Sequence, residues 1–354
     1  MTKRILIISP GQFGTHNGTY QYCKLLSKEH IISYFGINEN RQNIYLDNVK
    51  LNHLEITSNS FFNKIYFLTK LRSFLKFNNY DFIMANYFLG CSFLNLFTDD
   101  KKIVDIRSGY IYKNKFKRFF FNRLLLLEVS AFKNITVISI NLSKYLNLPK
   151  RAHHIPLGSP VFSTLEKSYD SFKLLYVGTF YQRNLHQAIN GFSKFYLEYK
   201  DFIKMEMNIV GVGNNADIQL IKDTISELSI GHVVKFLGEI RYPELNKHFE
   251  YHNIGLSYIP LTQYFNFQPP TKTFEYLSSG MITIATSTVE NISVINESNG
   301  ILIRDNEDSL FEGLKFLYNN KNNYNYYRIQ DNSRQYSWEN IVFNNLLPYL
   351  NKLD

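Results

Sequence analysis

The chain has 354 residues, of which 45% are hydrophobic and 19% charged, a balance that indicates a folded protein and excludes a largely disordered one. Its length exceeds one ordinary core, so we expect two domains. The formal net charge of +9 points to an anionic partner, with nucleic acid, anionic lipid and nucleotide-sugar phosphate as candidates. The two cysteines give neither a disulfide framework nor metal-site spacing, which fits a reducing cytoplasm.

The first elements in chain order predict an open α/β half. Residues 4–9 (RILIIS) form a continuous apolar run typical of a central parallel strand, and a Gly-rich turn and a helix from about Thr19 follow. The turn holds Gly11 and His16, and its spacing does not fit the GxGxxG dinucleotide fingerprint. Further strands are expected at 31–37, 81–85, 102–106 and 135–139, with an amphipathic helix at 61–77.

Arg107 directly follows the strand predicted at 102–106, at the carboxyl edge where open α/β sheets bind ligands. We expect Asp105 and Arg107 either to bind a ligand at this edge or to form a structural ion pair, and the sequence leaves both open. For His16, a loop histidine without a role is at least as good an interpretation as a binding residue. His153 and His154 are adjacent on a strand and point to opposite faces, which argues against a metal site.

Residues 111–127 combine five basic side chains with many Phe and Leu residues. This composition suits an interfacial helix on an anionic membrane, and it equally suits a core-packing helix with a basic outer edge. No apolar run approaches the roughly 20 residues of a membrane span. The N-terminus runs straight into a strand, so we expect no signal peptide, a cytoplasmic location and at most peripheral attachment to the inner face of the membrane.

A polar stretch at 163–171 is expected to be a linker, and 172–177 (FKLLYV) begins a second Rossmann-like half. Its first loop contains Gly178, Thr179 and Arg183, and the planar guanidinium of Arg183 suits bidentate contact with a phosphate. A solvent-exposed arginine without a role is the alternative. Strands are expected at 205–210, 233–236, 254–259 and 281–285, and helices at 185–199, 217–228, 242–251, 271–279, 308–317 and 341–350, with a surface turn at 319–327.

The stretch 268–285 (QPPTKTFEYLSSGMITIA) carries the strongest local signal. Two prolines open a short helix at Thr271, and Gly280 ends it. The N-terminus of a helix offers free N–H groups and a positive dipole to phosphate, and Lys272 in the first turn is unfavourable there unless an anion is near. Glu275 lies one turn further on and can accept hydrogen bonds from sugar hydroxyls. An ordinary βα unit with a solvated lysine and glutamate is the alternative.

The run Pro270-Thr-Lys-Thr-Phe-Glu-Tyr-Leu-Ser-Ser-Gly280 resembles the donor-site motif of the family 4 glycosyltransferases (glycosyl transferases group 1), and looks most like the branch with a Pro-x-Lys-x-x-Glu-Tyr core. The resemblance implies the GT-B fold, an α/β architecture of two Rossmann-like domains facing each other across a cleft. It implies an acceptor domain at 1–165, a nucleotide-sugar domain at 166–335 and a final helix at 336–354 that crosses back. The common form of the motif has a second Glu where this chain has Phe267, which leaves the donor sugar undefined.

The resemblance also implies roles for single residues. Arg183 and Lys272 would meet the donor diphosphate and act in catalysis, and Glu275 would bind the ribose. Glu239 and Ile240 would border the nucleobase, and Gly11, His16 and Arg107 would lie on the acceptor side. The remaining donor-binding residues would be Gly178, Thr179 and Thr271.

The implied activity is transfer of a hexosyl or related sugar from a nucleotide-sugar to a glycan acceptor, with retention of configuration and without a metal or other cofactor. The basic charge and residues 111–127 favour a polyprenyl- or lipid-linked acceptor in bacterial capsule, lipopolysaccharide or O-antigen assembly. Two other classes stay open: a nucleotide-sugar epimerase of the same fold, and a non-catalytic binding protein. Nucleic acid is not expected as a partner, because the basic residues are scattered through α/β units and no nucleic-acid motif is present.

Overall fold

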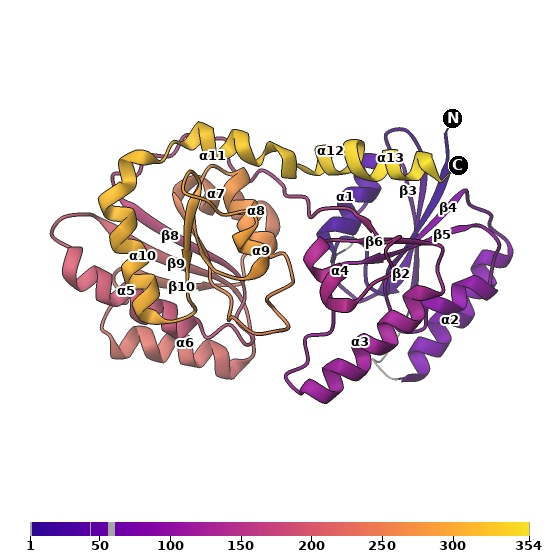
Figure 1. Cartoon of the computed structure of the whole chain (residues 1–354), viewed down its shortest axis with the longest axis horizontal. Coiled ribbons are helices and arrows are strands. Elements are labelled where there is room, and N and C mark those ends of the chain that lie inside the picture. The colour runs from indigo at the N-terminus through magenta and orange to yellow at the C-terminus, as the bar shows by residue number, and fades with distance from the viewer. Residues whose placement is uncertain (1, 43, 56–60, 354) are drawn as a thin grey trace. The chain divides into compact units, whose positions relative to one another are not determined.

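The computed structural model describes residues 2–42, 44–55 and 61–353. The chain divides into two compact units (Figure 1). The first contains Met1–Leu157 and Trp338–Asp354, and the second contains Gly158–Ser337. The boundaries expected from the sequence lay at 165/166 and 335/336.

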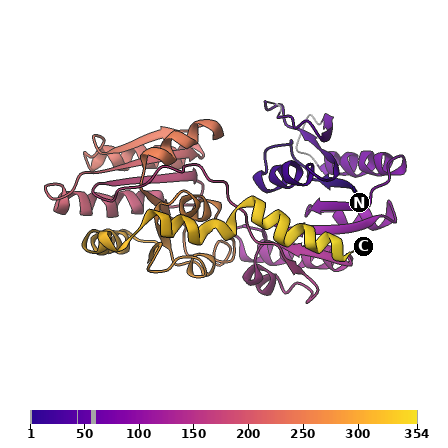
Figure 2. The ribbon, with the colours of Figure 1, turned by 90° about the horizontal axis from the view of Figure 1, so that it is seen from above.

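The first unit is built on a seven-stranded sheet with the order β3-β2-β1-β4-β5-β6-β7, all neighbours parallel. Strand β1 lies near the middle, and its residues Ile5 to Ile8 are all buried, as a central parallel strand requires. In Figure 2 the indigo segments of this unit lie toward one side and the magenta segments toward the other, in agreement with β2 and β3 at one edge of the sheet and β6 and β7 at the other. The strands are β1 (Arg4–Ile8), β2 (Ile31–Asn38), β3 (Val49–Glu55), β4 (Phe82–Asn86), β5 (Lys101–Ile106), β6 (Asn134–Val137) and β7 (His153–His154).

Helices cover both faces of this sheet, because right-handed crossovers that move in opposite directions place their helices on opposite sides. Figure 1 shows α2 and α3 on the lower side of the first unit and α1, α12 and α13 on the upper side. The helical segments are α1 (Asn17–Leu26), α2 (Phe61–Lys76), the 3₁₀ helix η1 (Cys91–Leu96), α3 (Lys115–Ser130), α4 (Ile140–Leu146), α12 (Trp338–Ile341), the π-helical η4 (Val342–Leu346) and α13 (Leu347–Lys352).

The second unit has a six-stranded parallel sheet with the order β10-β9-β8-β11-β12-β13. Figure 1 shows α5 and α6 below its strands and α7, α8 and α11 above them. The strands are β8 (Phe172–Thr179), β9 (Met205–Val212), β10 (Val234–Gly238), β11 (Ile254–Ser257), β12 (Ile282–Thr286) and β13 (Gly300–Ile303). The helical segments are α5 (Leu185–Tyr199), α6 (Asn215–Glu227), α7 (Tyr242–Tyr251), α8 (Thr271–Ser278), α9 (Val289–Ile292), α10 (Glu307–Asn320), η2 (Lys321–Asn323), α11 (Tyr326–Ser333) and η3 (Arg334–Tyr336).

Alternate side chains of β8 enter two separate cores. Leu174 and Tyr176 pack with Phe192 of α5 in the larger cluster, and Leu175 packs with Phe249 of α7 in the smaller one. This alternation follows from the two-residue period of a strand. It fixes β8 between two helical layers and holds its carboxyl end in place.

Two expectations about connections were wrong. The stretch 163–171 is not a free linker: Lys167 is buried and its Nζ donates to the carbonyls of Phe249 (2.6 Å) and Glu250 (2.8 Å) at the end of α7. The orphan carbonyls of a helix end attract a cation, which explains why a polar stretch packs here. The Asn/Tyr-rich 319–327 is not a surface turn, because Tyr324 and Tyr326 are buried and Tyr326 lies against Gly280.

The helix expected at 111–127 begins later, at Lys115, where the Asn114 side chain accepts a hydrogen bond from the Lys117 N–H at 2.9 Å. This N-cap stabilises the start of α3. Strand β3 was not expected from the sequence, because its alternating side chains include too few apolar residues to form a recognisable strand pattern. None of the helices within the described ranges is long and apolar enough to cross a membrane.

Candidate functional site

The order in which the chain adds strands to the second sheet reverses between β8 and β11. The chain proceeds from β8 outward to β9 and β10 on one side, and from β11 outward to β12 and β13 on the other. Open α/β sheets bind ligands at such a switch point, beyond the carboxyl ends of the strands. Gly178 stands at the carboxyl end of β8 and Arg183 in the loop before α5. Lys272 lies in the first turn of α8, the helix that follows β11. The fold therefore brings together three of the residues selected from the sequence.

Gly178 and Gly211 make a close approach of β8 and β9 possible. Both have positive φ angles, +146° and +149°. A Cβ on Gly211 would lie 1.7 Å from the Gly178 carbonyl oxygen, and a Cβ on Gly178 would lie 3.1 Å from the Nζ of Lys272. A side chain at either position would displace the backbone or the lysine, so the site depends on the absence of both.

Lys272 is a buried cation without a counter-charge in contact. The residue is only 8% exposed, and its Nζ lies 3.6 Å from the centroid of the Tyr176 ring. Nζ has no hydrogen-bond partner among the residues that the structure describes. Burial, and secondarily the positive charge of Arg183, lowers the pKa of Lys272 well below its usual value. An anion at this point would relieve both penalties.

The guanidinium of Arg183, like the amine of Lys272, lies over an aromatic ring. Its Cζ lies 3.9 Å from the centroid of the Phe265 ring, and its Nη1 is buried without a partner within the described part of the chain. Burial lowers the pKa of this guanidinium. The two flanking residues, Gln182 and Asn184, have φ angles of 56° and 50°, in the left-handed region. The loop thus holds an arginine with one buried donor, Nη1, that has no partner among the described residues.

Buried side-chain hydrogen bonds hold the N-terminal turn of α8 in place. The Thr273 hydroxyl donates to the Asn291 amide oxygen (2.8 Å) and accepts from the Ser257 hydroxyl (2.7 Å), all in buried positions. At the other end of the helix, the Tyr276 hydroxyl accepts the Val177 N–H of β8 at 2.9 Å. These bonds fix α8 to β8 and β11. Thr271 is exposed at the first helical position, and Pro270 before it provides no side-chain cap.

Glu275 lies one helical turn after Thr271, on the same side as Lys272. It is partly buried. Burial raises its pKa to about 7, and the opposing attraction of Lys272 only partly offsets this. The carboxyl group therefore changes its protonation state near neutral pH. It can accept hydrogen bonds when it is ionised and can also donate one when it is protonated.

The other selected residues of this unit stand at the same edge of the sheet. Thr179 is exposed at the end of β8. Glu239 is exposed directly after β10, and the partly buried Ile240 packs on the smaller core with Val177. The structure gives no contact of either residue with Lys272 or Arg183. Sequence reasoning missed Tyr176 and Phe265, the rings under the two cations, because isolated aromatic residues carry no pattern.

In the first unit, Gly11 and His16 lie next to each other after β1. A Cβ on Gly11 would lie 3.5 Å from the His16 Nε2 and 3.2 Å from the Thr15 hydroxyl. Gly11 is buried and His16 is exposed at the N-cap position of α1, without a capping hydrogen bond from its side chain. An acceptor-side role for both remains a prediction.

Arg107 forms a structural ion pair with Asp105, one of the two alternatives that the sequence left open. Its Nε lies 3.0 Å from the Asp105 carboxylate, and its Nη2 donates to the Tyr22 hydroxyl at 2.9 Å. Asp105 is fully buried and also accepts from the Thr136 hydroxyl at 2.7 Å. Since a Cβ on Gly18 would lie 2.9 Å from Nη2, the guanidinium sits against the first turn of α1.

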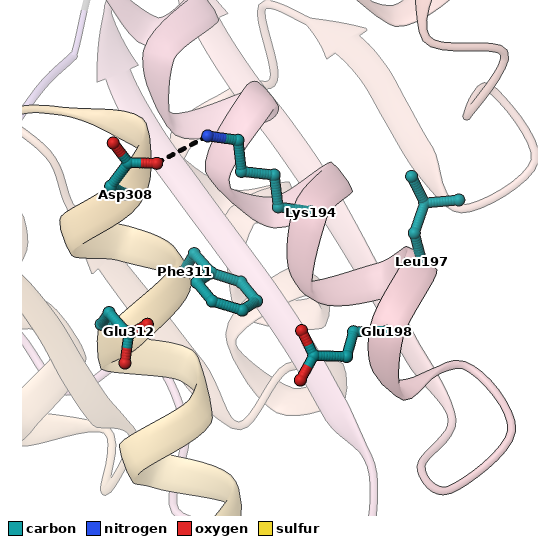
Figure 3. Close-up of a pocket in the computed structure, with 6 residues that line it drawn as sticks. All are labelled: Lys194, Leu197, Glu198, Asp308, Phe311 and Glu312. Carbon is teal, nitrogen blue, oxygen red and sulfur yellow. Dashed lines mark hydrogen bonds and ion pairs between the residues drawn. The ribbon is translucent and has the colours of Figure 1, made fainter.

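An open surface pocket lies elsewhere in the second unit, between α5 and α10 (Figure 3). Lys194 there forms ion pairs with Asp308 (2.6 Å) and Glu307 (2.9 Å), so its charge is already compensated. Phe311 and Leu197 supply apolar walls. None of the residues selected from the sequence lines this pocket. Across the described ranges, no group of three or more His, Cys, Asp or Glu side chains could hold a metal ion.

Comparison with known proteins agrees with this geometry. Residues 171–320 match the family model described as "Glycosyl transferases group 1". A search of curated proteins found no match for the sequence.

Solved structures share the fold over nearly the whole chain. One is sucrose-phosphate synthase from Thermosynechococcus elongatus, at a TM-score of 0.78 and 15% identity, covering 99% of both chains. Another is Anabaena HepE in complex with UDP-glucose, at 0.73 and 12% identity, covering 99% of this chain and 100% of that one. A third is the lipopolysaccharide outer core galactosyltransferase WaaB, at 0.71 and 12% identity, covering 98% and 99%.

Both units thus have the architecture of the GT-B fold, and the family match spans residues 171–320, which contain Arg183, Lys272 and the rest of α8. The chain is a glycosyltransferase with the GT-B fold, and its residues 171–320 match the family model of the glycosyl transferases group 1.

Proposed function

We propose that the second unit binds a nucleotide-sugar donor at the switch point between β8 and β11. Arg183, Lys272 and the free N–H groups at the start of α8 hold the diphosphate. Glu275 binds the ribose hydroxyls, and the turn at Glu239 and Ile240 borders the nucleobase. Gly178, Thr179 and Thr271 approach the phosphates through their backbone.

The observation that carries this proposal is a pair of basic side chains, the buried Lys272 and the partly buried Arg183, that form no ion pair with an acidic side chain. Lys272 Nζ and Arg183 Nη1 each lack a hydrogen-bond partner among the described residues, and each lies on an aromatic ring. Buried charges in proteins are normally paired, because desolvation costs several kcal/mol. Two such side chains beside one helix N-terminus favour a ligand with at least two negative charges. Similarity to HepE, solved with UDP-glucose, supports a diphosphate donor.

Catalysis then consists mainly of stabilising the leaving group. Bond cleavage at the anomeric carbon transfers negative charge to the β-phosphate oxygen, and cations that meet this charge accelerate the reaction more than they strengthen ground-state binding. Arg183 and Lys272 supply that charge without a divalent ion or other cofactor. We propose retention of configuration, which follows from the family resemblance alone.

For the acceptor we propose a glycan carried on a lipid such as polyprenyl diphosphate, in the assembly of a bacterial surface polysaccharide (capsule, lipopolysaccharide or O-antigen). The first unit would receive it near Gly11, His16 and Arg107. The basic and aromatic segment 111–127 would then face the anionic inner surface of the cell membrane. Similarity to WaaB, a lipopolysaccharide galactosyltransferase, supports this class of acceptor.

Thermal unfolding against a panel of nucleoside diphosphates and nucleotide-sugars, in the presence of a chelator, tests the donor site. We expect the nucleotides of one base to raise the melting temperature of the wild-type protein, and we expect Lys272→Ala to lose that increase. A matched variant, Lys194→Ala in the ion-paired surface pocket, should keep it. Equal stabilisation of wild type and Lys272→Ala would exclude the diphosphate site at α8.

A further inference from the structure

The outward side of α3 is apolar where a surface helix is normally polar. Phe116, Phe120 and Leu127 are 87%, 63% and 71% exposed, while Leu125 and Val129, on the opposite side of the helix, are fully buried. A helix with apolar residues all round is normally covered on all sides. Exposed apolar patches of this kind mark an interaction surface.

Helix α2 repeats this arrangement. Phe67 and Leu71 are buried toward the sheet, whereas Phe62, Ile65 and Tyr66 are 76%, 48% and 43% exposed. The sequence had suggested only an amphipathic helix at this place. Its exposed aromatic residues show that the helix has a second apolar side, which faces away from the core.

The two helices belong to one layer on the same face of the first sheet (Figure 1). The segment between β4 and β5, which contains η1, contacts both helices. The Phe67 ring of α2 lies 5.5 Å from the Phe88 ring, and the Glu128 carboxylate of α3 accepts the Gly90 N–H at 2.7 Å. Within η1, Leu96 is 76% exposed. The exposed apolar residues of α2, η1 and α3 therefore belong to a common face.

The exposed charged side chains of α2, η1 and α3 are all basic. They are Lys64, Lys70, Arg72, Lys76, Lys115, Lys117 and Arg123. The only carboxylate in α2, η1 and α3 is Glu128, which is bound on the inner side by the Gly90 N–H, the Ser92 hydroxyl (3.3 Å) and the Tyr87 hydroxyl (2.9 Å). Exposed aromatic rings alternate with cations: Lys70 lies 5.3 Å from the Tyr66 ring and Arg123 lies 5.1 Å from the Phe119 ring.

We propose that α2, η1 and α3 together form a docking face for an anionic lipid bilayer, with the aromatic and leucine side chains inserted at the headgroup level and the cations on lipid phosphates. This inference deepens the proposed function and rests on it for its purpose, which is to reach a lipid-linked acceptor. The chemistry favours a bilayer over a second copy of the chain, because a symmetric contact would oppose seven exposed cations with the same seven. Short helices with this composition lie in the interface plane and do not span it.

Co-sedimentation of the full chain with vesicles tests this inference. We expect binding to vesicles of phosphatidylcholine with phosphatidylglycerol and little binding to phosphatidylcholine alone. Each cation near the surface strengthens binding by about fivefold, so Lys70→Gln/Lys76→Gln on α2 should weaken it roughly 30-fold. Phe116→Ser/Phe120→Ser on α3 should weaken binding to a similar degree. The matched control Lys200→Gln/Phe202→Ser changes one exposed lysine and one exposed phenylalanine of the second unit and should have no effect.

The outcomes separate this inference from the donor site. Nucleotide-induced stabilisation should be the same in the wild type and in all these variants, because none of the changed residues belongs to the proposed donor site. Loss of vesicle binding in the α3 variant alone would overturn the common face and leave only α3 as a membrane contact. Absence of binding to anionic vesicles, or a dimer in light scattering that Phe116→Ser/Phe120→Ser dissociates, would overturn the bilayer as the occupant.

Discussion

Replacing Lys272 by Met should stabilise the unliganded protein and weaken nucleotide binding at the same time. Methionine keeps the volume and flexibility of the lysine stem but removes the amine, which is buried against Tyr176 without a hydrogen bond. A polar group buried in this way costs about 1–3 kcal/mol by mutational measure, part of which the contact with the ring offsets. We therefore expect a net gain of about 1–2 kcal/mol.

For a unit of this size, 1 kcal/mol corresponds to roughly 2–4 °C, so the melting temperature should rise by roughly 2–8 °C. Diphosphate affinity should fall by roughly 10- to 150-fold, since one charge-assisted contact is worth about 1.5–3 kcal/mol. Differential scanning fluorimetry with and without the nucleotide gives both quantities in one experiment.

The gain in stability should also depend on pH, and its sign follows from the pKa of Lys272. Burial lowers this pKa in the folded state below the ordinary value of 10.5. The unfolded chain then binds the proton more tightly, so the stability of the wild-type protein rises with pH up to about 10.5. The advantage of Lys272→Met should be largest at low pH and should shrink toward that value. A destabilised variant with unchanged nucleotide affinity would refute the reasoning, because it would show a lysine that serves packing alone.

Three further predictions concern the same site. Arg183→Ala should lower the transfer rate more than tenfold with little change in melting temperature, as about 1.5–3 kcal/mol of transition-state stabilisation is lost; near-normal turnover would exclude its role at the diphosphate. In the wild-type protein we expect donor affinity to rise as the pH passes about 7, and Glu275→Gln should abolish this rise. The raised pKa of Glu275 also makes the wild-type protein lose stability as pH rises from 4.5 to 7, and the variant should lose less. Parallel pH profiles for the two proteins, in calorimetry and in thermal unfolding, would contradict both expectations. Gly211→Ala should cost at least about 3 kcal/mol in chemical denaturation, because its Cβ meets the Gly178 carbonyl, whereas Gly231→Ala, whose Cβ would meet only the Ile225 methyl at 3.7 Å, should be nearly neutral; equal costs would show that β8 and β9 tolerate separation.

Much of the second unit was predictable from local patterns. Continuous apolar strands, the prolines before Thr271 and the glycine at 280 located β11, α8 and β12 to within a residue or two. Lys272 was recognisable because a cation is out of place in the first turn of a helix. The GT-B fold and the glycosyltransferase activity predicted from the motif were confirmed.

Other features were hidden because they depend on contacts distant in the sequence. Tyr176 and Phe265 support the two cations from elements that no spacing connects to them. The 163–171 stretch was taken as a linker because it is polar, yet Lys167 caps α7 from far away in the chain. The membrane interpretation was limited to 111–127, because the exposure of Phe62 on α2 follows from its orientation on the sheet and not from its composition.

The central claim is that a diphosphate is bound by Arg183 and Lys272 without a metal. Isothermal titration calorimetry in the presence of a chelator tests it most directly, by comparing the nucleoside diphosphate that stabilises the protein with its nucleoside. We predict that the diphosphate binds the wild-type protein at least about 100-fold more tightly than the nucleoside, and that Arg183→Ala/Lys272→Met removes most of this difference. Equal affinity for nucleoside and diphosphate, or a difference that survives in the double variant, would contradict the account.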